Sequence, residues 1–129
     1  MNIIADTNIF LAVALNEPEK DTIIQLTSGS DILSPEILPY EIGNALSTMV
    51  KRKKITQKEA LSAQNKTNAI PVRLINVDIQ KALKLAIKFN IYAYDAYFLQ
   101  GAKVLSYPLI TLDKRMKQVA NELNIKLLE

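Results

Sequence analysis

The sequence contains no cysteine and no histidine, and these two absences remove most of the usual catalytic side chains. Without cysteine, disulfide bonds, thiolate nucleophiles and thiolate metal sites are excluded. Without histidine, imidazole acid–base catalysis is excluded and a typical zinc site is disfavoured. Any chemistry must therefore come from carboxylates, hydroxyls, amides, lysine, arginine or tyrosine. Carboxylates favour hard cations such as Mg²⁺ or Mn²⁺.

Long apolar segments are also absent. No apolar run approaches the roughly 20 residues that span a bilayer. The N-terminus does not resemble a signal peptide, because it lacks a basic leader and because Asp6 and Asn8 interrupt its apolar stretch. The 129 residues contain no repeat or linker, so one domain over residues 1–129 is expected. We expect a cytoplasmic protein without membrane association.

Short apolar segments alternate with amphipathic segments along the chain. Strands are expected near residues 3–5, 31–34, 71–75, 109–111 and 125–128. Helices are expected near 8–15, 17–27, 38–52, 56–68 and 76–90, and from 92 and 112 onward, with Asn76 capping the fifth. This alternation predicts an α/β fold with a mainly parallel central sheet of about four or five strands and helices on both faces.

Two aspartates follow two of these strands in the same way. Asp6 comes directly after Ile3, Ile4 and Ala5, and Asp113 follows the segment that ends at Thr111. Ligands of open α/β sheets bind beyond the carboxyl ends of the strands. If the two strands are neighbours, both carboxylates meet at that edge.

Two further acids lie near the first turns of helices that face the same edge, Glu41 and Asp95. Four carboxylates packed together repel one another unless a cation neutralises them or some remain protonated. A divalent metal is the simplest solution. Such an ion would lower the pKa of a bound water and neutralise charge on a phosphate.

The order of four motifs resembles that of the PIN-domain family. The motifs are Asp6-Thr7-Asn8, Pro39-Tyr40-Glu41-Ile42-Gly43-Asn44-Ala45-Leu46, Tyr94-Asp95-Ala96-Tyr97 and Thr111-Leu112-Asp113. Each motif alone is weak, but four in this order, over almost the whole chain, are fairly specific. The compact length without large insertions further resembles a VapC-type toxin, the ribonuclease of a toxin–antitoxin pair.

The resemblance implies a PIN-like three-layer α/β/α fold and cleavage of RNA phosphodiester bonds with one or two Mg²⁺ or Mn²⁺ ions. By position, the family's metal-binding and catalytic acids correspond to Asp6, Glu41, Asp95 and Asp113, and its supporting polar residues correspond to Asn8 and Thr111. It also implies a homodimer and a VapB-type antitoxin that blocks the acidic site.

Charge and exposed groups suggest partners without specifying them. Apart from the four acids, 16 basic residues face 9 acidic ones, so the remaining surface carries about +7. This balance fits RNA or an acidic protein segment. Tyr92, Tyr94 and Tyr97 either stack on bases or pack as half-buried aromatics. The apolar residues of 9–15 and 23–26 are a candidate surface for a dimer or an antitoxin.

Other interpretations of the acids remain open at this level. Asp6 and Asp113 could simply cap the helices that follow them, and Glu41 could be an ordinary exposed helix residue. Aspartate-nucleophile phosphatases also carry an acid after the first strand, but they use a paired Asp-x-Asp and Asn8 occupies the second place here. Receiver domains need a mid-chain phosphorylated aspartate, which this sequence does not reveal. A catalytically silent PIN-like module that binds RNA or protein is the remaining alternative.

Overall fold

The computed structural model describes all residues from Met1 to Glu129 and contains four strands and seven helices. The strands are β1 (Asn2–Ala5), β2 (Asp31–Pro35), β3 (Arg73–Ile75) and β4 (Leu109–Ile110). The helices are α1 (Thr7–Ala14), α2 (Lys20–Thr27), α3 (Leu38–Lys51), α4 (Gln57–Asn68), α5 (Ile79–Phe89), α6 (Ala93–Leu105) and α7 (Lys114–Glu122).

All the strands are parallel and lie in the order β3-β2-β1-β4. Ala5 at the end of β1 pairs with Ile110 at the end of β4. A fifth strand over residues 125–128 was expected, but this segment forms only a single parallel bridge from Leu127 to Leu109. The sheet therefore has four strands, within the expected number.

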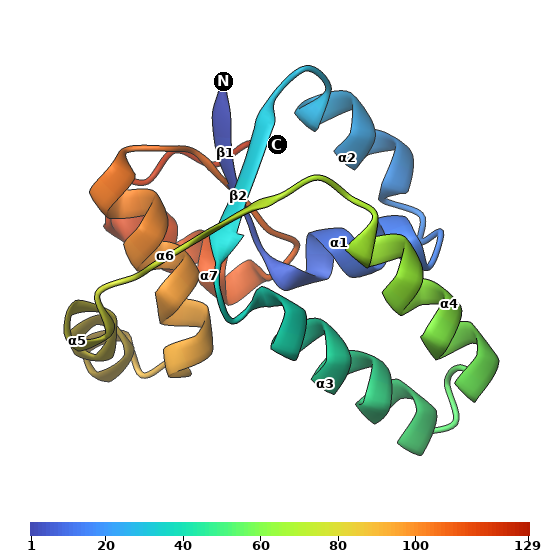
Figure 1. Ribbon diagram of the computed structural model, residues 1–129. Coiled ribbons are helices and arrows are strands. Elements are labelled where there is room, and N and C mark those ends of the chain that lie inside the picture. The colour runs from blue at the N-terminus through green and yellow to red at the C-terminus, as the bar shows by residue number, and fades with distance from the viewer.

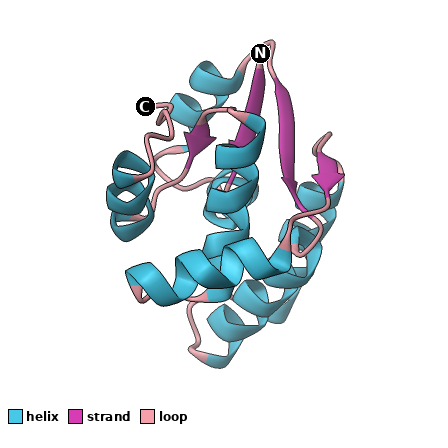
Figure 2. Ribbon diagram, turned by 90° about the vertical axis from the view of Figure 1, so that its left-hand side faces the viewer, coloured by secondary structure: helices cyan, strands magenta, loops and turns pink.

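Helices cover both faces of the sheet, as the α/β alternation predicts. In Figure 1, α5 and α6 lie on one side of β1 and β2, while α1, α2 and α4 lie on the other. Helix α6 packs against β1 and β2, and α1 packs against α2, α3 and α4. Figure 2 shows the two long strands starting near the N-terminus at the top and pointing toward the helices below. The carboxyl ends of the strands thus face the starts of the helices.

Local signals place most helix boundaries correctly. Thr56 and Glu59 form the expected capping box of α4, with reciprocal hydrogen bonds of 3.1 and 3.0 Å. Pro39 lies in the first turn of α3, where its missing N–H has no helical partner to lose. The prediction that Asn76 caps α5 is wrong, because Asp78 is the capping residue and its Oδ1 accepts from the Lys81 amide at 3.0 Å.

The candidate apolar interface on the first two helices is largely buried, although Ile24 stays 48% exposed. Within it, Ile9, Phe10 and Leu11 are at most 6% exposed and Ile23 is 4% exposed, so they belong to the main hydrophobic core. Helix α5 instead packs through the buried residues Ala82, Leu85 and Ala86, and it leaves a stripe of apolar side chains exposed.

That exposed stripe, called here the α5 stripe, consists of Ile79, Leu83 and Ile87. These side chains are spaced one helical turn apart and are 66%, 47% and 73% exposed. No helix of the structure has the length and apolar character needed to cross a membrane.

Candidate metal centre

The sheet changes its direction of winding between β1 and β4. From β1 the chain adds β2 and β3 on one side, and β4 then joins the other side of β1. A crevice outside the carboxyl ends of the strands forms at such a switch point in open α/β sheets. Asp6 and Thr111 directly follow the two strands that flank it, and the Asp6 amide donates to the Ile110 carbonyl at 3.0 Å.

Asp6 is fixed at this point by two hydrogen bonds. Its Oδ1 accepts from the Thr7 amide at 2.8 Å as the cap of α1, and its Oδ2 accepts from the Thr111 hydroxyl at 2.7 Å. Both residues of this second contact are buried, with Asp6 5% and Thr111 3% exposed. The carboxylate therefore serves as a helix cap, which was one of the alternatives, and it also links the ends of the neighbouring strands β1 and β4.

The segment after β4 is tied to the same place. The Thr111 hydroxyl also accepts from the Asp113 amide at 3.1 Å, and the Leu112 amide donates to Oδ1 of Asn8 at 3.3 Å. Asp113 caps α7 by accepting from the Met116 amide at 2.9 Å. Asn8 and Thr111 thus hold the turn that carries Asp113 against the turn that carries Asp6.

Glu41 and Asp95 enter from the first turns of α3 and α6. Both side chains are half-buried. Oε1 of Glu41 is buried without a hydrogen-bond partner, and so is the hydroxyl of Thr7. The Thr7 hydroxyl lies near enough to lower the pKa of Glu41, but no hydrogen bond of normal geometry joins the two groups. A buried carboxylate oxygen without a partner is costly.

The pKa values of the acids show that their charges interact. Burial raises the pKa of Asp6 to about 6, and the charges of Asp95 and Asp113 raise it further against the opposing effect of its two hydrogen bonds. Burial, followed by the charges of Asp6 and Asp95, raises the pKa of Glu41 to about 7. Burial and then the charge of Asp113 raise the pKa of Asp95. The four predicted acids therefore lie close enough for their charges to oppose one another.

No cationic side chain of the protein relieves this repulsion. The only ion pair in the structure joins Lys117 to Glu129, and the hydrogen bonds of Asp6 and Asp113 come from backbone amides and one threonine hydroxyl. No three acidic side chains stand close enough together to form a ready-made ligand set. The donors nevertheless fit a hard cation, because they are all carboxylates and one buried oxygen of Glu41 has no other partner.

Two residues near the site were not singled out from the sequence. Thr7 contributes the buried hydroxyl beside Glu41. Ser34 is 0% exposed, and its Oγ donates to the Ala5 carbonyl at 2.6 Å, which ties β2 to β1 one residue before Asp6. A hydroxyl at the end of an apolar strand was the only sequence signal for Ser34, and such residues are common in turns.

Comparisons with known proteins agree with this arrangement. A family model described as "PIN domain" matches residues 3–122. No curated protein matches the chain significantly. The crystal structure of PAE2754 from Pyrobaculum aerophilum is similar, with a TM-score of 0.71 and 20% identity, over 92% of this chain and 79% of that one. VapBC2 from Rickettsia felis, bound to a DNA fragment from its promoter, is also similar, with a TM-score of 0.65 and 17% identity, over 98% and 97% of the two chains. At these identities the likeness to both structures concerns the fold.

Proposed function

Because this chain belongs to the PIN-domain family over residues 3–122, we propose that it is a metal-dependent endoribonuclease and the toxin of a VapBC-type pair. PIN domains are generally nucleases. The cleavage of RNA, the dependence on Mg²⁺ or Mn²⁺ and the role as a toxin are the parts that we propose. The likeness of the fold to that of the VapBC2 complex supports the toxin assignment.

The observation that carries the proposal is a set of four acids that repel one another without an internal cation. Burial raises the pKa values of Asp6, Glu41 and Asp95, and the charges of this set raise them further, with Asp113 acting on two of them. Oε1 of Glu41 is buried without a partner. Perturbed carboxylates gathered in a crevice are typical of functional sites. A purely structural role would favour a neutral or salt-bridged arrangement at this position.

We assign the four carboxylates to holding the cation. When bound, a divalent ion would activate water as a nucleophile and neutralise charge on the phosphate. Asp6 and Asp113 lie after adjacent strands and keep their places through Thr111, whose hydroxyl donates to one and accepts from the backbone of the other. In the metal-free protein the pKa of Glu41 is about 7, so this group can exchange a proton at neutral pH.

A homodimer and a VapB-type antitoxin complete the proposal. The α5 stripe supports a protein partner, because contiguous apolar side chains on a protein surface mark interaction sites. We assign Leu83 and Ile87 of this stripe to the homodimer contact. Lys81, Lys84 and Lys88 lie on the same helix, so the contact between two copies should tighten as salt screens their repulsion.

The test is cleavage of a labelled structured RNA by the purified protein in Mg²⁺, in Mn²⁺ and in EDTA. The Asp6→Asn variant removes one charge at nearly constant shape, and Asp31→Asn is a matched control at an exposed position on the same sheet. We expect cleavage with metal by the native protein and by Asp31→Asn, and none by Asp6→Asn or in EDTA.

Cleavage that persists unchanged in EDTA or in Asp6→Asn would refute the assigned site. Binding of several RNAs without cleavage by any form would favour the alternative of a catalytically silent PIN-like module that binds RNA or protein.

A further inference from the structure

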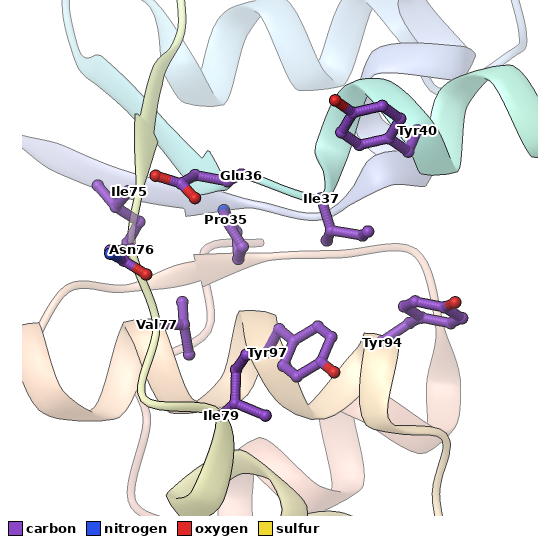
Figure 3. Close-up of a pocket in the computed structure, with 10 residues that line it drawn as sticks. All are labelled: Pro35, Glu36, Ile37, Tyr40, Ile75, Asn76, Val77, Ile79, Tyr94 and Tyr97. Atoms are coloured by element: carbon purple, nitrogen blue, oxygen red, sulfur yellow. The ribbon is translucent and has the colours of Figure 1, made fainter.

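A groove of about 330 Å³ lies at the carboxyl ends of β2 and β3, at the edge of the sheet that also carries the acids, although none of the four acids lines it. Pro35 and Ile75, the last residues of these strands, form part of its wall. Seven of its ten lining residues are hydrophobic. In Figure 3, Tyr40 comes from α3 and Tyr94 from α6, so two helices contribute aromatic rings to it.

The groove is connected to the candidate metal centre through the chain itself. Tyr40 immediately precedes Glu41, and Tyr94 immediately precedes Asp95. These two acids are electrostatically coupled, because the charge of Asp95 raises the pKa of Glu41. Because Tyr40 and Tyr94 are the chain neighbours of these two acids, a group that stacks on the tyrosines would lie within a few residues of a phosphate held at the acids.

The aromatic side chains of the groove are more exposed than a core requires. Tyr40 is 74% and Tyr94 54% exposed. The Tyr94 ring packs edge-on against Tyr97, with ring centres 6.1 Å apart and planes 77° apart. Of Tyr92, Tyr94 and Tyr97, for which base stacking and half-buried packing were both considered, only Tyr97 is half-buried. The exposed rings of Tyr40 and Tyr94 leave faces on which another planar group can stack.

The polar side chains of the groove indicate whether it binds the bases or the phosphates of a nucleic acid. Glu36 and Asn76 lie toward one end in Figure 3, and Tyr40 and Tyr94 toward the other. No lysine or arginine lines the groove, and Glu36 would repel a phosphate. A carboxylate accepts hydrogen bonds from base amino groups, and an amide can both donate to and accept from a base edge.

We propose that this groove binds one unpaired nucleobase of the RNA, next to the phosphate cleaved at the acids. The base stacks on Tyr94 and Tyr40, and its edge faces Glu36 and Asn76. Single-stranded RNA is commonly recognised in this way, by stacking on aromatic side chains and by contacts to the base edges. The proposal rests on the proposed ribonuclease function and adds a preference for an unpaired base beside the cleaved bond.

The absence of tryptophan allows a direct test by fluorescence. Tyr94→Trp in the Asp6→Asn background places a single indole in the groove of a protein that leaves RNA uncleaved. A short oligoadenylate should quench this indole, and an abasic ribose–phosphate chain of the same length should not. Tyr92→Trp in the same background is the control, because Tyr92 is 81% exposed, lies two residues away and does not line the groove.

A second measurement uses binding of labelled oligoadenylate to Asp6→Asn and to the same protein with Tyr94→Ala. Loss of one base–aromatic stack should weaken binding roughly tenfold to hundredfold. Binding of the abasic chain should change little.

The outcomes separate this inference from the nuclease proposal. Equal quenching of the two indoles, or no quenching in Tyr94→Trp while the native protein cleaves RNA, would overturn the base site and leave the nuclease intact. Selective quenching without cleavage by the native protein would support the base site and refute the nuclease. A lower molar mass in solution for Tyr40→Ala would assign the groove to a contact between copies and overturn the inference.

Discussion

Replacing Asp6 by asparagine should stabilise the metal-free protein at pH 8 while it abolishes cleavage. Asp6 is buried, and its pKa rises from 3.8 to about 6. The folded state therefore retains a proton that the unfolded state releases between these values. The stability contributed by protonated Asp6 is fully present below about pH 4 and is lost as the pH rises through about 6. Above that pH the native protein carries a buried charge that the variant lacks.

The size of the effect follows from the two pKa values. Their difference corresponds to about 3 kcal/mol in the free energy of unfolding. Asparagine can keep both contacts of Asp6, since its oxygen can accept from the Thr7 amide and its NH₂ group can donate to the Thr111 hydroxyl oxygen. The variant should thus be up to about 3 kcal/mol more stable than the native protein at pH 8, and nearly equal to it at pH 4.

Ionisation of Glu41 lowers the stability of the folded protein in the same direction as that of Asp6. Its pKa is raised to about 7, with the charge of Asp6 as the second cause after burial. The native protein should therefore continue to lose stability up to about pH 7. Removing the charge of Asp6 should lower the pKa of Glu41 and reduce this part of the loss as well.

The assay is urea unfolding in EDTA at pH 4, 6 and 8 for the native protein, Asp6→Asn and the exposed control Asp31→Asn. Asp31→Asn should follow the pH profile of the native protein. Added Mn²⁺ or Mg²⁺ at pH 8 should stabilise the native protein and not Asp6→Asn, because an ion that binds only the folded state raises its stability. The reasoning fails if Asp6→Asn and the native protein lose stability in parallel from pH 4 to pH 8.

Two further predictions concern the support of the site and the proposed dimer. Thr111→Val removes the hydroxyl that lowers the pKa of Asp6, so unfolding free energy in EDTA should fall by about 1.5–3 kcal/mol at pH 8 and by less at pH 4, where Asp6 is protonated. An equal loss at both pH values in urea unfolding would contradict this coupling. Leu83→Ser should shift the mass measured by light scattering toward the monomer, whereas Leu61→Ser, at a 60% exposed site on α4, should not. A monomeric native protein at high concentration would rule out the dimer.

The meeting of Asp6 and Asp113 at one edge of the sheet was predicted from the sequence on the condition that their strands are neighbours. Both follow short apolar segments, and the carboxyl ends of parallel strands face one edge. The sequence does not state that β1 and β4 are neighbours, since that depends on the chain crossing back over the sheet after three strands. The strand order of the structure, in which β4 pairs with β1, meets this condition.

The periodicity of apolar residues predicted the positions of the helices well. It predicted less well which face of each helix is buried against the rest of the protein. The spacing of Ile79, Leu83 and Ile87 has the same form as that of a core-facing stripe. The contact of α5 with α6 is instead made by the buried residues Ala82, Leu85 and Ala86. Conversely, the apolar residues of α1 lie on more than one face of the helix. They are buried nearly all round because the main core surrounds this short helix. Burial is set by the neighbours of a helix, and periodicity within one segment carries no information about them.

The burial of these acids lowers the stability of the fold, and a functional role explains why they are there. Asp6 is a buried carboxylate at the end of β1, and Glu41 has a buried oxygen without a partner, although a neutral side chain of similar shape would avoid both penalties. Residues that lower the stability of the fold are expected at functional sites. If Asp6→Asn proves more stable without metal and inactive with it, the carboxylate is retained for binding a cation. Folding alone would then favour the amide.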